Sequence, residues 1–173
     1  SQALTSSRQR NLMQGLWGNF NMANLKLFNK WDTTHVSVSD PGLKKYVTLN
    51  TMMVPRSFGR NNNSRFEKSK SHIVERLMNR LMVSGHKGKK HYRSSGHMTG
   101  KVNNVYHAVL KSFEIIEEKT KKNPVQVFVT ALENAAPREE ITTIEYGGAR
   151  YPQAVDCAPQ RRIDVALRQM TQG

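Results

Sequence analysis

The chain has 173 residues, enough for one domain with a hydrophobic core. It carries 27 lysines and arginines against 13 aspartates and glutamates, a formal net charge of +14, which favours a polyanionic partner: nucleic acid or an anionic membrane surface. No apolar run suits a spanning helix, and the single Cys157 excludes an internal disulfide or a cysteine-rich zinc site. The composition therefore argues against an integral membrane protein or a disulfide-rich secreted domain, and favours an intracellular nucleic-acid-binding protein.

The positive charge is concentrated in the middle of the chain. Residues 1–55 contain six basic and two acidic residues, residues 56–101 contain twelve and two, and residues 102–173 contain nine of each. A merely solvated surface is the alternative interpretation, but ordinary surfaces mix both signs. The central excess of ten positive charges therefore predicts a phosphate-binding surface.

The start of the chain, residues 1–30, contains no acidic residue and is rich in Ser, Asn, Gln and Arg. We predict a flexible basic arm, in which Trp17, Phe20 and Phe28, together with Trp31 just beyond, could pack or stack. The same composition also fits an organelle transit segment, and that alternative stays open here.

Residues 31–70 are predicted to form a basic extended or loop segment. A turn is indicated at Asp40-Pro41-Gly42, and the stretch from Pro55 to Lys70 has almost nothing apolar with which to build a core. Residues 71–173 are predicted to form a helical domain. Ser71 is the expected cap of its first helix, in which apolar residues recur at helical spacing between Ile73 and Met82. Arg76 and Arg80 fall one turn apart on the polar, outward side of this helix.

Three further helices are expected. One runs from about Lys101 to Lys119, and the next begins at Asn123-Pro124, with Asn as cap and Pro at the first helical position. The last begins at Pro159 and turns Arg161, Arg162 and Arg168 outward. The interval from Gly85 to Gly100 is expected to be a basic, glycine-bearing loop.

A β-hairpin is predicted at about residues 139–156, because two β-prone runs flank Gly147-Gly148. Pro152 makes it an edge or free-standing ribbon, which is more stable against a partner such as RNA. The predicted fold class is therefore mainly α: a helical bundle domain with a protruding β-hairpin and extended basic N-terminal arms.

The candidate RNA-binding residues are the cations of the central segment and two tyrosines of the hairpin. Extended basic segments can follow a phosphate backbone and release its counterions, and tyrosines can stack on unpaired bases. The candidates are Arg56, Arg60, Arg65, Lys68, Lys70, Arg76, Arg80, Lys87, Lys89, Lys90, Arg93, Lys101, Tyr146 and Tyr151.

Other chemistries have weak support. Gly96 to Val102 falls one residue short of a phosphate-binding Walker loop and lacks its Ser or Thr. Cys157 lies beside Asp156, which raises a thiol pKa and opposes a nucleophilic role. Four histidines could suggest a metal, but basic neighbours repel a cation: His72, His86, His91 and His97. No enzyme, cofactor or metal site is predicted.

Several ordered motifs resemble the small-subunit ribosomal protein seven family, over about residues 25–173. Motifs near Leu27 and Asp40 resemble the archaeal and eukaryotic branch. The matching motifs are Leu27-Phe28-Asn29-Lys30-Trp31-Asp32, Asp40-Pro41-Gly42-Leu43, Ile73-Val74-Glu75-Arg76-Leu77, Gly88-Lys89-Lys90, Phe113-Glu114-Ile115-Ile116, Asn123-Pro124, Glu133-Asn134-Ala135-Ala136-Pro137-Arg138-Glu139, Tyr146-Gly147-Gly148-Ala149-Arg150-Tyr151-Pro152, Ala154-Val155-Asp156 and Pro159-Gln160-Arg161-Arg162.

The resemblance implies a structural constituent of the cytoplasmic small ribosomal subunit. It implies binding to the 3′ major domain of small-subunit rRNA, nucleation of head assembly, contact with neighbouring head and platform proteins, and a hairpin near the exit-site tRNA and the mRNA exit path. It adds Arg138, Arg150, Arg161 and Arg162 to the RNA contacts. Glu145 departs from the family, which usually has a basic residue at this position. Family members also continue beyond the position of Gly173.

The runner-up is a non-ribosomal nucleic-acid-binding protein, such as an assembly chaperone or a DNA-compacting factor. It should bind duplex DNA about as well as folded ribosomal RNA. An enzyme acting on RNA is a third class, which requires a convergent acid–base or metal site that the sequence does not indicate.

Overall fold

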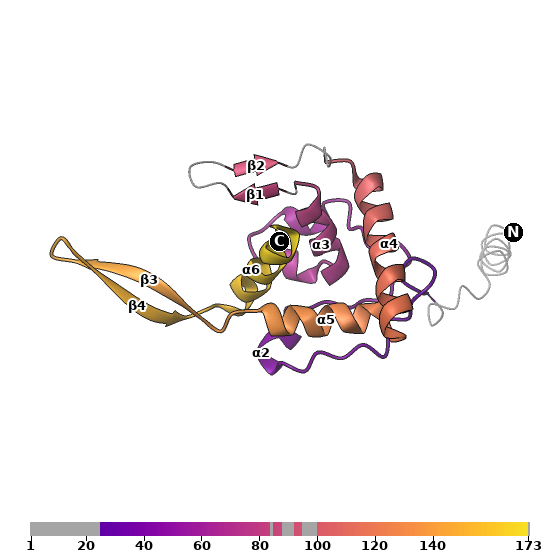
Figure 1. Ribbon diagram of the computed structural model, residues 1–173, viewed down its shortest axis with the longest axis horizontal. Helices are drawn as coiled ribbons and strands as arrows, with labels where there is room; N and C mark the ends of the chain where they lie inside the picture. Colours follow the sequence, from indigo (N-terminus) through magenta and orange to yellow (C-terminus); the bar gives the residue numbers. More distant parts are fainter. Residues whose placement is uncertain (1–24, 84, 88–91, 95–99, 173) are drawn as a thin grey trace, which may run out of the picture.

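The computed structural model describes residues 25–83, 85–87, 92–94 and 100–172 (Figure 1). The longer helices and the long hairpin follow the predicted order, which confirms a mainly helical domain with a β-hairpin. The helices are α2 (Pro41–Lys44), α3 (Ile73–Leu81), α4 (Val102–Thr120), α5 (Pro124–Ala135) and α6 (Pro159–Gln172), with the 3-10 turns η2 (Arg60–Asn62) and η3 (Glu67–Lys70).

Helix α3 lies at the centre, beside α6 and near the start of α4 (Figure 1). Its Ile73, Val74 and Met78 are buried. The prediction that Ser71 caps this helix is wrong: the N-cap is His72, whose Nδ1 accepts a hydrogen bond from the Val74 amide at 3.2 Å. Ser71 ends η3 instead, and its hydroxyl accepts from the Asn61 side chain at 3.0 Å.

The join between α4 and α5 is as the sequence predicts. Helix α4 ends where Lys121 adopts a left-handed conformation, at φ 55°. Asn123 then caps α5, because its Oδ1 accepts from the Val125 amide at 3.0 Å, and Pro124 occupies the first turn, where its missing amide hydrogen costs nothing. Local side-chain chemistry therefore fixes this corner of the bundle.

The segment before α2 belongs to the core. Leu27 and Phe28 are buried, although the sequence division placed them in a flexible arm. Phe28 and Trp31 meet Phe113 of α4 edge to face, with ring centroids 6.1 and 5.7 Å away. Leu43 of α2 is also buried, so residue 71 does not mark the start of the hydrophobic core. The predictions for residues 1–24, flexible arm or transit segment, lie outside the described residues.

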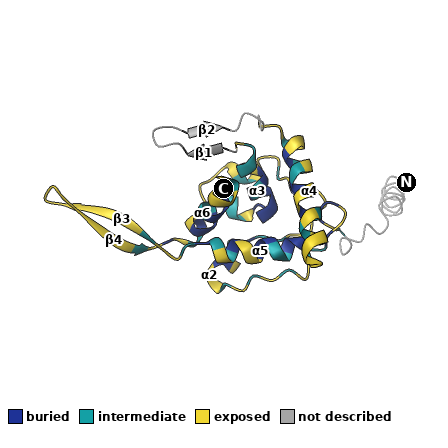
Figure 2. Cartoon of the chain, viewed as in Figure 1, coloured by how far each residue is buried: buried dark blue, intermediate teal, exposed yellow. Residues whose placement is uncertain are grey.

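The long hairpin consists of β3 (Glu139–Tyr146) and β4 (Ala149–Asp156), paired antiparallel. Gly147 and Gly148 form its turn at φ +58° and +81°, values that a side chain disfavours. The ribbon projects from the helical body and is exposed along almost its whole length (Figures 1 and 2). The predicted hairpin boundaries are confirmed.

A second, shorter ladder replaces part of the expected loop between Gly85 and Gly100. Strands β1 (Gly85–Lys87) and β2 (Tyr92–Ser94) pair antiparallel, with His86 opposite Arg93. The sequence signal was hidden because glycine, lysine and histidine are weak strand formers. The basic, glycine-bearing loop expected between Gly85 and Gly100 therefore contains paired strands at these six positions, which the sequence did not predict.

Candidate nucleic-acid interface

A basic arm, residues 55–70, lies along α3 and carries three exposed arginines. Arg56, Arg60 and Arg65 have no carboxylate partner within the described part of the chain. The arm is nevertheless fixed: the Ser57 amide and hydroxyl both donate to Glu75 Oε1 of α3, at 2.8 and 2.6 Å. These charges therefore sit on a held backbone and not on a free tail.

Two exposed phenylalanines accompany the arginines of the arm. The guanidinium of Arg56 lies 4.6 Å from the ring centroid of Phe58, and that of Arg65 lies 5.8 Å from that of Phe66. Phe58 is 74% exposed and Phe66 67%. Sequence reasoning missed both, although an aromatic residue in a stretch without other core residues was a usable signal. Arginine–aromatic pairs offer stacking surfaces for bases beside charges for phosphates.

The remaining cations of the arm bond carboxylates of α6 and of the arm itself. Lys68 bonds Asp164 of α6, and Lys70 pairs with Glu67 at 3.2 Å. Both lysines keep part of their surface in solvent, so both remain accessible to a binding partner. Arg80 of α3 is half-buried and Lys101 is exposed, and neither has an ion pair among the described residues.

Arg76 and Arg162 correct the sequence analysis, which placed both on polar, outward faces. The side chain of Arg76 is 5% exposed, and it bonds Asp164 at 2.9 Å and the Tyr46 carbonyl at 3.2 Å. Arg162 bonds Asp40 at 2.8 Å and the Pro137 carbonyl at 3.0 Å. Their guanidinium groups join distant segments, and the structure gives them protein partners in place of solvent.

The carboxylates that receive these arginines have lowered pKa values. Burial alone raises the pKa of Asp164, but hydrogen bonds from Lys68 and Arg76 outweigh it. A hydrogen bond from Arg162 lowers the pKa of Asp40. Both aspartates are therefore held in the charged form that a buried arginine requires.

The hairpin is acidic, contrary to the impression given by the whole chain. Residues 139–156 contain four acidic residues and one basic residue, Arg150. Arg150 faces Glu145 across the ribbon at 3.5 Å, and Arg161, just beyond, bonds Glu140. Arg138, at the hairpin's base, is exposed without an ion pair in the part of the chain described. Phosphate attraction along the hairpin is correspondingly weak.

The tip of the hairpin offers aromatic surface instead. Tyr146 is 82% exposed and Tyr151 59%. Tyr151 is paired with Ile144, and Tyr146 lies two residues further along the same strand, so the three side chains share one face. The opposite face carries the Glu145–Arg150 pair. The hairpin therefore suits stacking or apolar contact better than binding to phosphates.

Four candidate cations have side chains outside the described residues. Lys87 is on β1 and Arg93 on β2, but only their backbone is described. Lys89 and Lys90 lie in the interval between these strands and are not described at all. Their contribution to the interface stays a prediction.

Cys157 is not placed for nucleophilic chemistry. Its thiol is buried, and burial together with Glu140 raises its pKa. Asp156 was expected to have this effect, but Glu140 is the carboxylate that raises the pKa in the structure. Among the described residues, no three His, Cys, Asp or Glu side chains are arranged to hold a metal ion. None of the helices described has an apolar stretch of the length that a membrane span requires.

A helical body, a fixed strip of exposed arginines with aromatic rings beside them, and a projecting ribbon together define a class: a nucleic-acid-binding protein. The chain belongs to the ribosomal protein S7p/S5e family, whose model matches residues 43–173.

Relatives named small ribosomal subunit protein uS7 confirm this placement. That of Nanoarchaeum equitans (strain Kin4-M) is 59% identical over 149 residues, covering 86% of this chain and 75% of the relative. That of Methanosphaera stadtmanae is 51% identical over 148 residues, covering 86% and 73%. That of Methanococcus vannielii is 45% identical over 149 residues, covering 86% and 71%. The similarity to archaeal members agrees with the branch expected from the sequence.

Proposed function

We propose that the chain is a structural constituent of the small ribosomal subunit in the cytoplasm, that it binds the 3′ major domain of small-subunit rRNA, and that it nucleates assembly of the subunit head. The observation that supports this most is the basic arm. Its three arginines are exposed, without ion pairs among the residues that the structure describes, on a backbone that Glu75 holds against α3. A rigid strip of charge fits folded RNA by shape, because A-form helices hide their base edges.

The hairpin is proposed to lie near the exit-site tRNA and the mRNA exit path, with head and platform proteins as neighbours. Its exposed tyrosines support contact with unpaired nucleobases or with apolar protein surface. Phosphate contacts are less favoured there, since residues 139–156 contain a single basic side chain, that of Arg150. No catalytic role is proposed, because these contacts position RNA and require no reacting group.

Co-sedimentation with small ribosomal subunits after a high-salt wash tests this proposal. We expect the protein to remain with the assembled subunits, because salt screens contacts that are buried against folded RNA much less than it screens solvent-exposed charges. As a control, the affinity of the free protein is measured for duplex DNA and for ribosomal RNA of similar length. Release at high salt, with equal affinity for duplex DNA and ribosomal RNA, would instead identify a non-ribosomal nucleic-acid-binding protein.

A further inference from the structure

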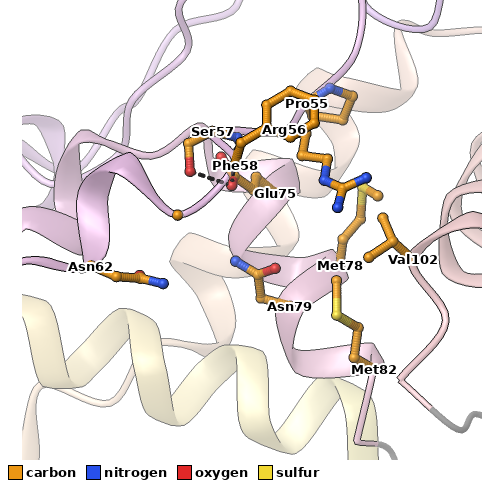
Figure 3. A pocket seen from close by; sticks show the side chains of 11 residues that line it. Pro55, Arg56, Ser57, Phe58, Asn62, Glu75, Met78, Asn79, Met82 and Val102 are labelled. Atoms are coloured by element: carbon orange, nitrogen blue, oxygen red, sulfur yellow. Dashed lines mark hydrogen bonds between the residues drawn. The ribbon is translucent and has the colours of Figure 1, made fainter.

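A pocket opens between the basic arm, α3 and the start of α4 (Figure 3). Its volume is about 260 Å³, which is below the range of about 300–1,000 Å³ that holds drug-sized ligands. A pocket of this size suits a single planar ring system. Met78, Met82 and Val102 line one side, and Glu75 and Asn79 bring polar groups into it. It therefore combines apolar walls with a polar edge.

Glu75 supplies the unusual feature of this pocket. The residue is 5% exposed, and its Oε1 already accepts two hydrogen bonds from Ser57. Its second oxygen, Oε2, is buried and has no hydrogen-bond partner among the described residues. A buried carboxyl oxygen without a donor costs free energy, so a ligand that brings a donor is favoured there.

We infer that this pocket takes an unpaired guanine base of the bound RNA. The inference rests on the proposed function, and it adds a base-reading site to a surface otherwise made for phosphates. Guanine presents two adjacent donors, N1–H and the N2 amino group, beside the O6 acceptor. Adenine and cytosine place a ring-nitrogen acceptor next to their amino group, and uracil flanks its single donor with two acceptors. Guanine therefore suits a lone acceptor oxygen best.

Asn79 completes the match. It lies four residues after Glu75 on α3, so the two side chains share one face of the helix. An amide can donate to the guanine O6 while Glu75 Oε2 accepts from N1–H and the amino group. The methionines opposite are flexible, polarizable side chains that pack well on an aromatic ring.

A second hollow of about 280 Å³ adjoins the pocket and shares Asn62 and Asn79 with it. Lys68, Arg76 and Arg80 line this hollow together with the single carboxylate of Asp164, so it keeps a net positive charge, whereas the first pocket has the apolar walls. A nucleotide has the same division, an uncharged base joined to an anionic phosphate. A metal ion is disfavoured, since these cations and Arg56 would repel it.

Glu75→Gln is the decisive variant. The glutamine Oε1 can keep both hydrogen bonds from Ser57, while the free oxygen becomes an amide donor that opposes the guanine donors. The variant formally raises the net charge by one, so electrostatics alone would strengthen RNA binding. Glu118→Gln, on an exposed position of α4, makes the same charge change away from the pocket and serves as the matched control.

The first readout is affinity for a transcript of the 3′ major domain of an archaeal small-subunit rRNA, measured at several salt concentrations. We expect Glu75→Gln to bind about 5- to 100-fold more weakly with an unchanged salt slope, because a base contact releases no counterions. Unchanged affinity overturns the inference, and so does a loss that comes with a shallower slope. Glu118→Gln should bind as the parent does.

The second readout needs no large RNA. Methyl NMR of Met78 and Met82 is followed while GMP, AMP, CMP or UMP is added to the full chain. We expect GMP alone to shift both methyl groups, and Glu75→Gln or Asn79→Ala to abolish the shift. Asn79 is exposed, so its truncation spares the fold. No response, or an equal response to all four nucleotides, overturns the inference.

The two measurements separate this inference from the proposed function. If the parent binds the transcript with a steep salt dependence while Glu75→Gln binds equally well, the guanine site is wrong and the ribosomal role stands. If the parent fails to prefer the transcript over duplex DNA, the proposed function fails, whatever GMP does to the methionines.

Discussion

Arg76 and Asp164 are 88 positions apart in the sequence, and their side chains meet at 2.9 Å between α3 and α6. Asp164 also accepts a hydrogen bond from Lys68, so a single carboxylate joins the basic arm, the central helix and the last helix. The scaffold that presents the exposed cations of the arm is thus itself held together by charge.

Asp164→Ala should destabilise the protein by about 3–5 kcal/mol, because it leaves the buried Arg76 guanidinium without its counter-charge. Urea unfolding followed by circular dichroism measures the change. Asp156→Ala, at an exposed hairpin position without an ion pair in the described residues, is the control and should stay within about 0.5 kcal/mol. Similar effects of the two variants would contradict a structural role for the Asp164 pair.

His72 makes the fold sensitive to mild acid. Burial lowers its pKa from 6.5 to about 4, while its Nδ1 caps α3. Because the folded-state pKa is the lower one, the unfolded chain binds a proton first as the pH falls below 6.5. Stability should therefore drop by about 3 kcal/mol between pH 7 and pH 4. Urea unfolding at a series of pH values measures it.

His72→Asn provides the comparison, since asparagine can still cap the helix but does not titrate. Its stability should be nearly independent of pH between about 6.5 and 4.5. The lowered pKa values of Asp164 and Asp40 act in a different window, because their contribution is lost only as the pH falls toward and below 3.8. An equal slope in the parent and the variant would exclude His72 as the source.

Arg60→Glu together with Arg65→Glu should weaken binding to the 3′ major domain transcript and make its salt dependence shallower. For the parent we expect a log–log slope of about −4 or steeper, if six or more phosphates are contacted at about −0.7 each. Losing two contacts should reduce the slope by about 1.4. Lys119→Glu with Lys122→Glu changes the net charge equally on exposed positions of another surface, and equal losses would place the footprint elsewhere.

Tyr146→Ala and Tyr151→Ala should leave stability within about 0.5 kcal/mol of the parent, because both side chains already face solvent. Each should weaken binding to single-stranded RNA by about 1–3 kcal/mol if it stacks on a base. Fluorescence anisotropy with a labelled oligonucleotide reports this loss. Ile141→Ala removes an exposed apolar side chain from the other face of the ribbon, and an equal effect there would argue against stacking at the tyrosines.

The sequence by itself determined the local elements. Asn123-Pro124 begins a helix and Gly147-Gly148 turns a hairpin through chemistry confined to a few neighbouring residues, so their positions could be predicted without the rest of the chain. The excess of charge in the central segment also pointed to the arm from residues 55 to 70, and ordered motifs pointed to the family.

Only the tertiary structure decided which charges are free. Arg76 and Arg162 were expected to face outward, but α3 is covered on several sides, and the two arginines bond carboxylates that lie 88 and 122 positions away in the sequence. Glu75 became notable only when Ser57 occupied one of its oxygens and left the other buried without a hydrogen-bond partner among the described residues. A periodic pattern records which residues share a helix face, but it contains no information about which distant segment packs there.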